Sequence, residues 1–130
     1  MSLSDRITSL AARIGIEVKA KIDASHPGLA RAWANFGYVN GQMVMHSARN
    51  VVSVERLATG RYRVHFTQPM SDTDYCWIAL ARSSTDNGTQ RVAIVRASTD
   101  QKTANYVDVA CATMATSFAD STEINLVVYR

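Results

Sequence analysis

The chain has 130 residues, of which 47% are hydrophobic and 19% are charged. This composition suffices for the core of one domain and excludes an intrinsically disordered chain. The net charge is +3, and the 14 basic residues are spread thinly along the sequence, which argues against a dedicated nucleic-acid-binding protein with a dense basic patch.

The first 26 residues have a helical pattern. Ser2 is placed to cap the helix start with Asp5 as its capping-box partner, and Pro27 disfavours helical geometry in the residue before it. Gly15 is the one local conflict, since glycine weakens a helix interior. Apolar residues recur every three or four positions and define one face of an amphipathic helix: Leu3, Ile7, Leu10, Ile14, Val18 and Ile22.

This apolar face needs a partner, because an isolated helix of about 22 residues is marginal in water. Two arrangements stay open from the pattern: the helix folds back on its own domain, or it pairs with copies of itself. We favour the second, a self-associating stem over residues 1–26. Burial of each large side chain is worth about 1.5–3 kcal/mol, so the six could hold a small oligomer with help from the rest of the chain. The pattern is too short to distinguish a trimer from a dimer.

From Leu29 onward the pattern has a period of two. Tyr62, Val64 and Phe66, for example, alternate with charged or polar residues. Turn signals separate the alternating runs, and none of the intervening segments has room for a crossover helix. We therefore predict a mainly β fold, an antiparallel β-sandwich of about eight strands over residues 29–130. The expected strands are 31–38, 42–46, 51–57, 61–67, 75–82, 90–97, 104–112 and 122–129.

Two cysteines, Cys76 and Cys111, lie far apart in the sequence and form no Cys-x-x-Cys motif. Both fall in strands whose alternation is expected to point them inward. We predict two reduced thiols that pack as small hydrophobic side chains.

The sequence offers little that indicates catalysis. The three histidines belong to no recognisable catalytic or metal-binding motif, and there is no glycine-rich phosphate loop. The aspartates of 72–74 and 86–88 are interpreted as turn formers rather than calcium ligands. We therefore predict a protein that is not an enzyme and has neither a cofactor nor a metal. The alternative is a small glycan hydrolase, which would require two carboxylates about 5–10 Å apart in a cleft.

The start of the chain does not look like an export signal, because charged residues interrupt the first 15 positions. The longest apolar stretch, 75–81, is far too short to cross a bilayer, so we expect no membrane insertion. Synthesis in the cytoplasm follows, with later export only as part of a larger assembly.

Several segments follow one another in the order of a known β-domain. Residues 32–36 (A-W-A-N-F) are similar to an A-W-V-N-F opening, and 43–51 to V-A-I-R-x-S-x-N-V. Residues 60–75 are similar to G-x-Y-x-V-x-F-T-x-x-M-x-D-x-x-Y, and 10–20 to the helical stretch that often precedes it. These segments resemble the β-domain of tailed-bacteriophage tail fibres and related virion proteins. The similarity covers residues 8–80, with alanine at position 34 where the family often has valine and His46 where it often has a basic residue.

The resemblance implies a virion structural protein, a short tail fibre or appendage that contributes to host attachment. It implies a homotrimer with a coiled-coil stem and β-sandwich heads, made in the host cytoplasm and located in the virion. Expected partners are other tail, baseplate or capsid proteins and a host surface glycan. Alternatives are a capsid head fibre or decoration protein, and a stand-alone carbohydrate-binding module.

Receptor contacts are expected in the loops farthest from the stem, because loops on a rigid scaffold commonly carry binding. If each strand crosses the sandwich once, the first, third, fifth and seventh connections lie at that far end. A solvated tip without a ligand is the alternative. The candidate residues in these loops are Tyr38, Asn40, Ser84, Asp86, Asn87, Thr116, Phe118 and Asp120.

Overall fold

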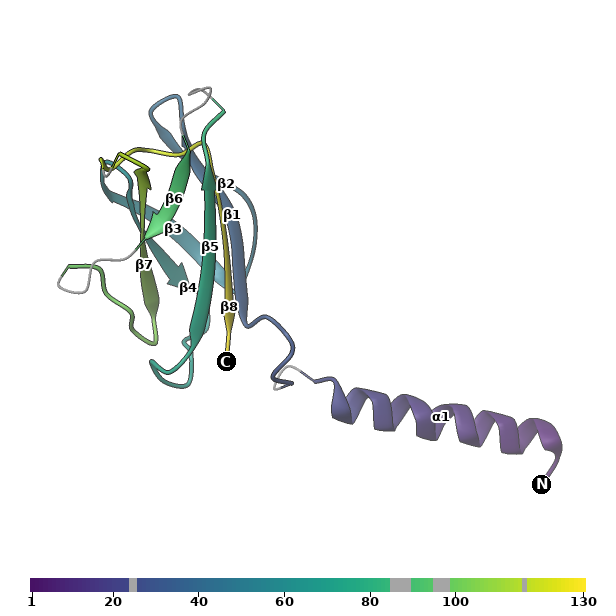
Figure 1. The fold of residues 1–130 in the computed structure, drawn as a ribbon. Helices are drawn as coiled ribbons and strands as arrows, with labels where there is room; N and C mark the ends of the chain where they lie inside the picture. The colour runs from purple at the N-terminus through teal and green to yellow at the C-terminus, as the bar shows by residue number, and fades with distance from the viewer. Residues whose placement is uncertain (24–25, 85–89, 95–98, 116) are drawn as a thin grey trace.

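The fold is seen in a computed structural model that describes residues 1–23, 26–84, 90–94, 99–115 and 117–130. Within these ranges, one N-terminal helix precedes eight strands, which form two four-stranded sheets packed face to face (Figure 1). Every strand pairing in the described residues is antiparallel, which confirms the predicted mainly β, antiparallel fold.

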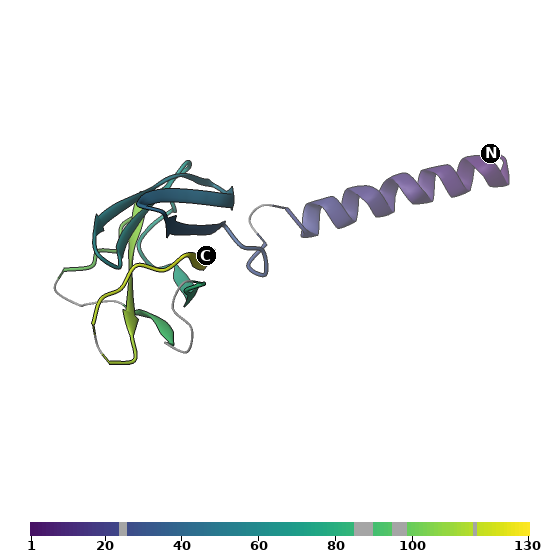
Figure 2. The ribbon, with the colours of Figure 1, turned by 90° about the horizontal axis from the view of Figure 1, so that it is seen from above.

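The helix α1 spans Leu3–Lys21 and begins with the predicted capping box. The Asp5 N–H donates to Ser2 Oγ at 3.2 Å, and the Ser2 N–H donates to the Asp5 carboxylate at 2.9 Å. The Ser2 hydroxyl also donates to the Asp5 carboxylate at 2.6 Å, and this bond, followed by the one from the Ser2 N–H, holds the pKa of the Asp5 carboxyl below its usual value. None of the helix residues is buried, and the helix lies apart from the sandwich in both views (Figures 1 and 2). It ends five residues before the predicted boundary, with Ile22 as its C-cap.

The two sheets each contain strands from both halves of the sequence. The first has the order β2-β1-β8-β5 and the second the order β3-β4-β7-β6. All eight expected strands are present, with boundaries displaced by up to three residues. Their bounds are β1 (Ala32–Val39), β2 (Gln42–Arg49), β3 (Val51–Ala58), β4 (Arg61–Phe66), β5 (Cys76–Arg82), β6 (Arg91–Ile94), β7 (Tyr106–Thr113) and β8 (Glu123–Tyr129).

The core lies between the sheets and follows the predicted alternation. In β4, Tyr62, Val64 and Phe66 are buried, and the residues between them are partly exposed. Aromatic rings cross the sandwich: the centroids of Phe36 and Tyr62 lie 5.8 Å apart in an edge-to-face arrangement. Such pairs add to the stabilisation from apolar burial. The core of the sandwich is formed without any residue of α1.

One of the two cysteine predictions is wrong. Cys111 is fully buried, as expected, but Cys76 is exposed. In β5 the inward positions belong to Trp77 and to the alanines at 79 and 81, so Cys76 at the start of the strand points outward. Both thiols are free.

The strand β7 is buried on both faces, unlike a typical strand of a two-layer sandwich. Asp108 would face solvent by alternation, yet it is only 2% exposed. The Gln101 N–H donates to the Asp108 carboxylate at 3.0 Å, so the segment before β7 covers this face. Arg63 forms two hydrogen bonds with the same carboxylate, at 2.7 and 3.0 Å, and so pairs the buried charge.

Among the described residues, no helix is long and apolar enough to span a membrane.

Candidate functional site

The connections between strands gather at two opposite ends of the sandwich. The end farthest from α1 is termed the distal end. Hydrogen bonds there join the end of β1 and the connection after β5 to the connection before β8: the Tyr38 N–H donates to the Ser121 carbonyl at 2.9 Å, and the Ser84 N–H to Thr122 Oγ1 at 2.8 Å. The opposite, proximal end carries residues 29–31, which follow the helix linker, and the connection after β4 (Figure 1). This arrangement agrees with the alternating strand direction on which the loop prediction depends.

The described receptor candidates at the distal end do not form one recess. Asn40 occupies an exposed turn with a φ of 52°, and Ser84 is exposed. Tyr38 is partly buried beneath the Arg56 guanidinium, whose carbon lies 4.5 Å from the ring centroid. Phe118 is half-buried and forms an isolated bridge with Ala112. The remaining candidates Asp86, Asn87 and Thr116 lie outside the described residues.

Asp120, the last receptor candidate, is engaged in internal contacts. Its carboxylate accepts hydrogen bonds from the Gly60 N–H at 2.9 Å, the Tyr62 hydroxyl at 2.8 Å and Arg56 Nη2 at 2.8 Å. Burial alone would raise the pKa of this carboxyl, but the hydrogen bonds outweigh it and hold the pKa below its usual value. The structure therefore gives Asp120 a structural role at the distal end, where it joins the β3–β4 turn to the connection before β8.

The outer faces of the two sheets differ in chemistry. The second sheet is charged and paired: Arg61 lies 3.0 Å from Asp100, and Arg63 lies 2.7 Å from Asp108. The first sheet instead presents an apolar strip, in which Trp33, Val127 and Ile78 lie side by side on β1, β8 and β5, with Leu80 next to Ile78 along β5. Ile78 is 61% exposed and Leu80 is 71% exposed, so this apolar strip is largely uncovered.

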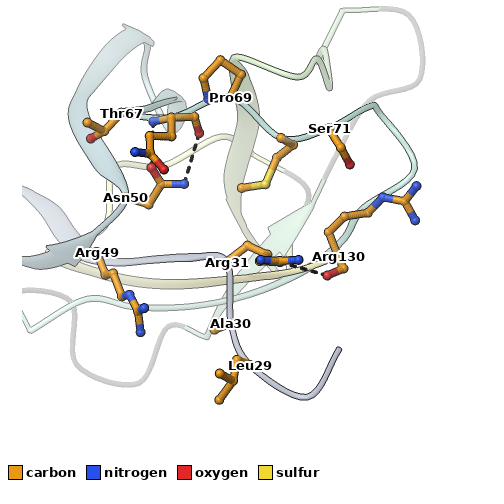
Figure 3. Close-up of a pocket in the computed structure, with 11 residues that line it drawn as sticks. Leu29, Ala30, Arg31, Arg49, Asn50, Thr67, Pro69, Ser71 and Arg130 are labelled. Atoms are coloured by element: carbon orange, nitrogen blue, oxygen red, sulfur yellow. Dashed lines mark hydrogen bonds between the residues drawn. The ribbon is translucent and has the colours of Figure 1, made fainter. Parts of the chain in front are cut away.

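A cavity of about 500 Å³ opens at the proximal end between the ends of several strands (Figure 3). Of the residues that the structure describes, three arginines contribute to its wall, and no aspartate or glutamate does. Its lining comes from four separate parts of the chain: Leu29, Ala30, Arg31, Arg49, Asn50, Thr67, Gln68, Pro69, Met70, Ser71 and Arg130.

The wall of this proximal cavity is fixed by hydrogen bonds around Asn50. This residue has a φ of 54°, in the left-handed region that asparagine tolerates better than most residues. Its side chain donates to the Gln68 carbonyl at 3.1 Å, the bond that a dashed line at Asn50 marks in Figure 3. It also accepts from the Gln68 N–H at 2.7 Å. The Thr67 N–H donates to the Asn50 carbonyl at 3.1 Å. Asn50 thus fastens the β2–β3 turn to the loop after β4.

The sequence did not predict the cavity. Arg31, Arg49 and Arg130 are separated by long stretches of chain, and no motif links them. Only the antiparallel pairing of β1 with β2 and β8 brings these positions together at one end. The Arg31 Nε donates to the Arg130 carbonyl at 3.0 Å, which closes one side of the cavity (Figure 3).

The segments that resemble the phage-fibre domain are mainly structural in this fold. Phe36, Met70 and Tyr75 are buried core residues, and the Tyr75 hydroxyl donates to the Thr103 carbonyl at 2.8 Å. Asn50 fixes the two proximal connections, as described above. These positions hold the sandwich together, and Asn50 and Met70 also line the proximal cavity. Comparison of the chain with protein-family models, with curated proteins and with solved structures finds no match.

Across the described ranges, no group of three histidine, cysteine, aspartate or glutamate side chains is placed to hold a metal ion. Three surfaces stand out as candidate sites: the apolar face of α1, the apolar strip of the first sheet, and the proximal cavity.

Proposed function

We propose that the chain is a structural protein of a bacteriophage virion, a short trimeric appendage that contributes to host attachment. The observation that carries the proposal is the uncovered apolar face of α1. Within this helix, Leu3, Ile7, Leu10, Ile14 and Val18 are between 52% and 73% exposed. An apolar face of this size is unusual on a monomeric protein and indicates an interaction surface.

Copies of the same helix suit this face. The spacing from Leu3 through Ile14 is four, three, four, which corresponds to the a and d positions of a coiled-coil heptad. Each buried side chain would contribute about 1.5–3 kcal/mol, and five or six per chain would offset the entropy of association. The family resemblance favours three copies over two.

The sandwich offers a second surface for association. Ile78 and Leu80 of the apolar strip belong to the same sheet as β1, the first strand after the helix linker. Heads gathered by a common stem would hold these strips close together. Helix and strip together supply more apolar area than the short helix alone.

The virion setting is supported by the ordered segments that resemble the tail-fibre domain. In such an appendage the stem joins tail, baseplate or capsid proteins, and the distal end with Tyr38, Asn40, Ser84 and Phe118 faces the host. A head fibre or decoration protein on the capsid would use the same stem and differ only in its position on the particle.

The oligomeric part of the proposal is tested by the mass of the intact chain in solution. Light scattering at micromolar concentration should give three times the 14.3 kDa of one chain. Ile14→Asp should reduce that mass, because it buries an unpaired charge in the stem. Ile16→Asp is the matched control: it makes the same change about 200° around the helix, outside the apolar face. A wild-type mass near one chain, or equal effects of the two variants, would contradict the stem.

The virion part is tested on purified particles of a phage that carries this gene. Antibodies against the sandwich should label a fixed position on the particles in electron microscopy. Particles that lack the chain would contradict the proposal, whatever the oligomeric state.

A further inference from the structure

We infer that the proximal cavity binds an acidic sugar, with Arg49 pairing with its carboxylate or phosphate group and Arg31 adding positive charge to the cavity wall. The binding is a property of the cavity itself, and only its role within a virion rests on the proposed function. The inferred site lies at the end of the sandwich opposite the predicted receptor loops.

The charge of the cavity points to an anion. Arg49 lies at the end of β2, and within the described chain its guanidinium has neither a hydrogen bond nor an ion pair. Among the described residues, Arg31 uses only Nε, which donates to the Arg130 carbonyl, so its terminal nitrogens are available. Arg130 is paired with Asp72 and adds less positive charge. An arginine with unused donors prefers the planar fork of a carboxylate or the oxygens of a phosphate.

The remaining wall suits the hydroxyl groups of a sugar. The side chains of Thr67 and Gln68 line the cavity and make no hydrogen bond within the described structure, while their backbone is fixed by Asn50. The backbone that carries these side chains is thus fixed before a ligand arrives, which lowers the entropic cost of binding. A volume of about 500 Å³ lies in the range of small-molecule sites and fits one or two sugar rings.

An acidic peptide fits the geometry less well. Extended peptides commonly bind by adding a strand to a sheet edge. The proximal cavity instead lies where strands end, and it presents side-chain donors rather than a row of free backbone groups.

The test is a titration of the full chain, followed by the amide resonances of residues 49, 50 and 68 and by calorimetry. The probes are glucuronate, glucose 6-phosphate, glucose, inorganic phosphate and a tetraglutamate peptide. We expect both acidic sugars to shift the three resonances and to bind at least about tenfold more tightly than glucose or inorganic phosphate. Binding should weaken as salt is raised, because the attraction is between charges.

Variants separate this cavity from general charge effects. Arg49→Gln should weaken the binding of either acidic sugar about tenfold, since it removes a donor that has no structural contact in the described chain. Arg13→Gln makes the same change in net charge on the exposed helix and should have no effect. Equal weakening by both variants, binding of inorganic phosphate as tight as that of the sugars, or binding of tetraglutamate alone would overturn the inference. The mass of the same samples by light scattering distinguishes the two proposals: a trimer that binds no sugar refutes only the cavity.

Discussion

The Tyr62 hydroxyl donates a hydrogen bond to the Asp120 carboxylate at 2.8 Å, which ties the core strand β4 to the connection before β8. Burial, together with this bond, raises the pKa of Tyr62 well above its usual value, so the hydroxyl stays a donor. Because Asp120 also accepts from Arg56 and Gly60, one carboxylate fixes the geometry of the distal end.

Replacement of this carboxylate should therefore destabilise the sandwich. Asp120→Asn should lower the free energy of unfolding by about 2–3 kcal/mol, because hydrogen bonds to a charged acceptor are lost and a donor is left unpaired. Glu123→Gln is the control: it weakens the exposed pair with Arg82 and should cost less than about 1 kcal/mol. Urea unfolding measures both, and equal costs would contradict the structural role of Asp120.

Below neutral pH, stability should decline only where the buried carboxyls titrate. Burial alone would raise the pKa of the Asp108 and Asp120 carboxyls, but hydrogen bonds from Arg63 and Arg56 and from backbone N–H groups bring both below the usual value. A carboxyl with a lowered folded pKa contributes full stability above its unfolded pKa of about 3.9, and the contribution disappears as the pH falls through the folded value. The free energy of unfolding should thus be level from pH 7 to about pH 5 and fall below about pH 4. The double variant Asp108→Asn, Asp120→Asn should show a shallower decline; an unchanged slope would refute this account.

The two thiols should differ in reactivity. Cys76 is exposed and should react with a thiol reagent in the native protein. Burial raises the pKa of the Cys111 thiol to about 11, so little thiolate forms and the reagent has no access. Titration should give one equivalent in the native state and two after unfolding. Two native equivalents would show that the sheet around Cys111 opens readily.

Gly37 has no room for a side chain. A Cβ at this position would lie 1.9 Å from the Thr122 carbonyl oxygen. This backbone atom directly precedes β8 and can move only with the start of that strand. Gly37→Ala should lower the free energy of unfolding by about 2–3 kcal/mol through overpacking. Gly15→Ala is the control in open space on α1 and should stabilise the helix by up to about 1 kcal/mol. Thermal unfolding with a higher midpoint for the Gly37 variant would contradict this close packing.

The apolar strip should contribute to association without contributing to folding. Ile78→Ser with Leu80→Ser removes two exposed side chains and should leave the unfolding free energy of the sandwich within about 0.5 kcal/mol. The trimer should dissociate at a higher protein concentration than wild type in a sedimentation dilution series. Val52→Ser, 59% exposed on the second sheet, should leave the dissociation unchanged. An equal effect of Val52→Ser would show that the strip is not a specific contact.

The sequence predicted the strands well, because alternation is strong wherever one face is buried. Tyr62, Val64 and Phe66 are an example of a pattern that decides both strand and face. The alternation predicts an end of β2 that is three residues too early. The reason is the register shift opposite Asn35 and Phe36, which interrupts the alternation near His46. Cys76 was assigned to the wrong face because β5 is apolar at nearly every position, and its exposed Ile78 and Leu80 look like core residues in the sequence.

The site was less predictable than the fold. The covering of Asp108 by the segment before β7 depends on a tertiary contact that alternation does not encode. Asp120 looked like a loop residue available to a ligand, and only the position of Tyr62 shows its internal partner. Strand pairing brings Arg31 and Arg49 to the wall of the proximal cavity. The positive charge of the cavity therefore cannot be predicted from the order of residues in the sequence.

The two ends of the sandwich segment lie side by side, and this has a practical consequence for handling the protein. The Arg31 N–H donates to the Val128 carbonyl at 2.8 Å, so a tag fused after Arg130 would emerge beside the proximal cavity and obstruct it. A tag fused before Met1 would instead be separated from the sandwich by a 19-residue helix, about 28 Å long. Immobilised through that end, the protein would present both ends of its sandwich to the solution.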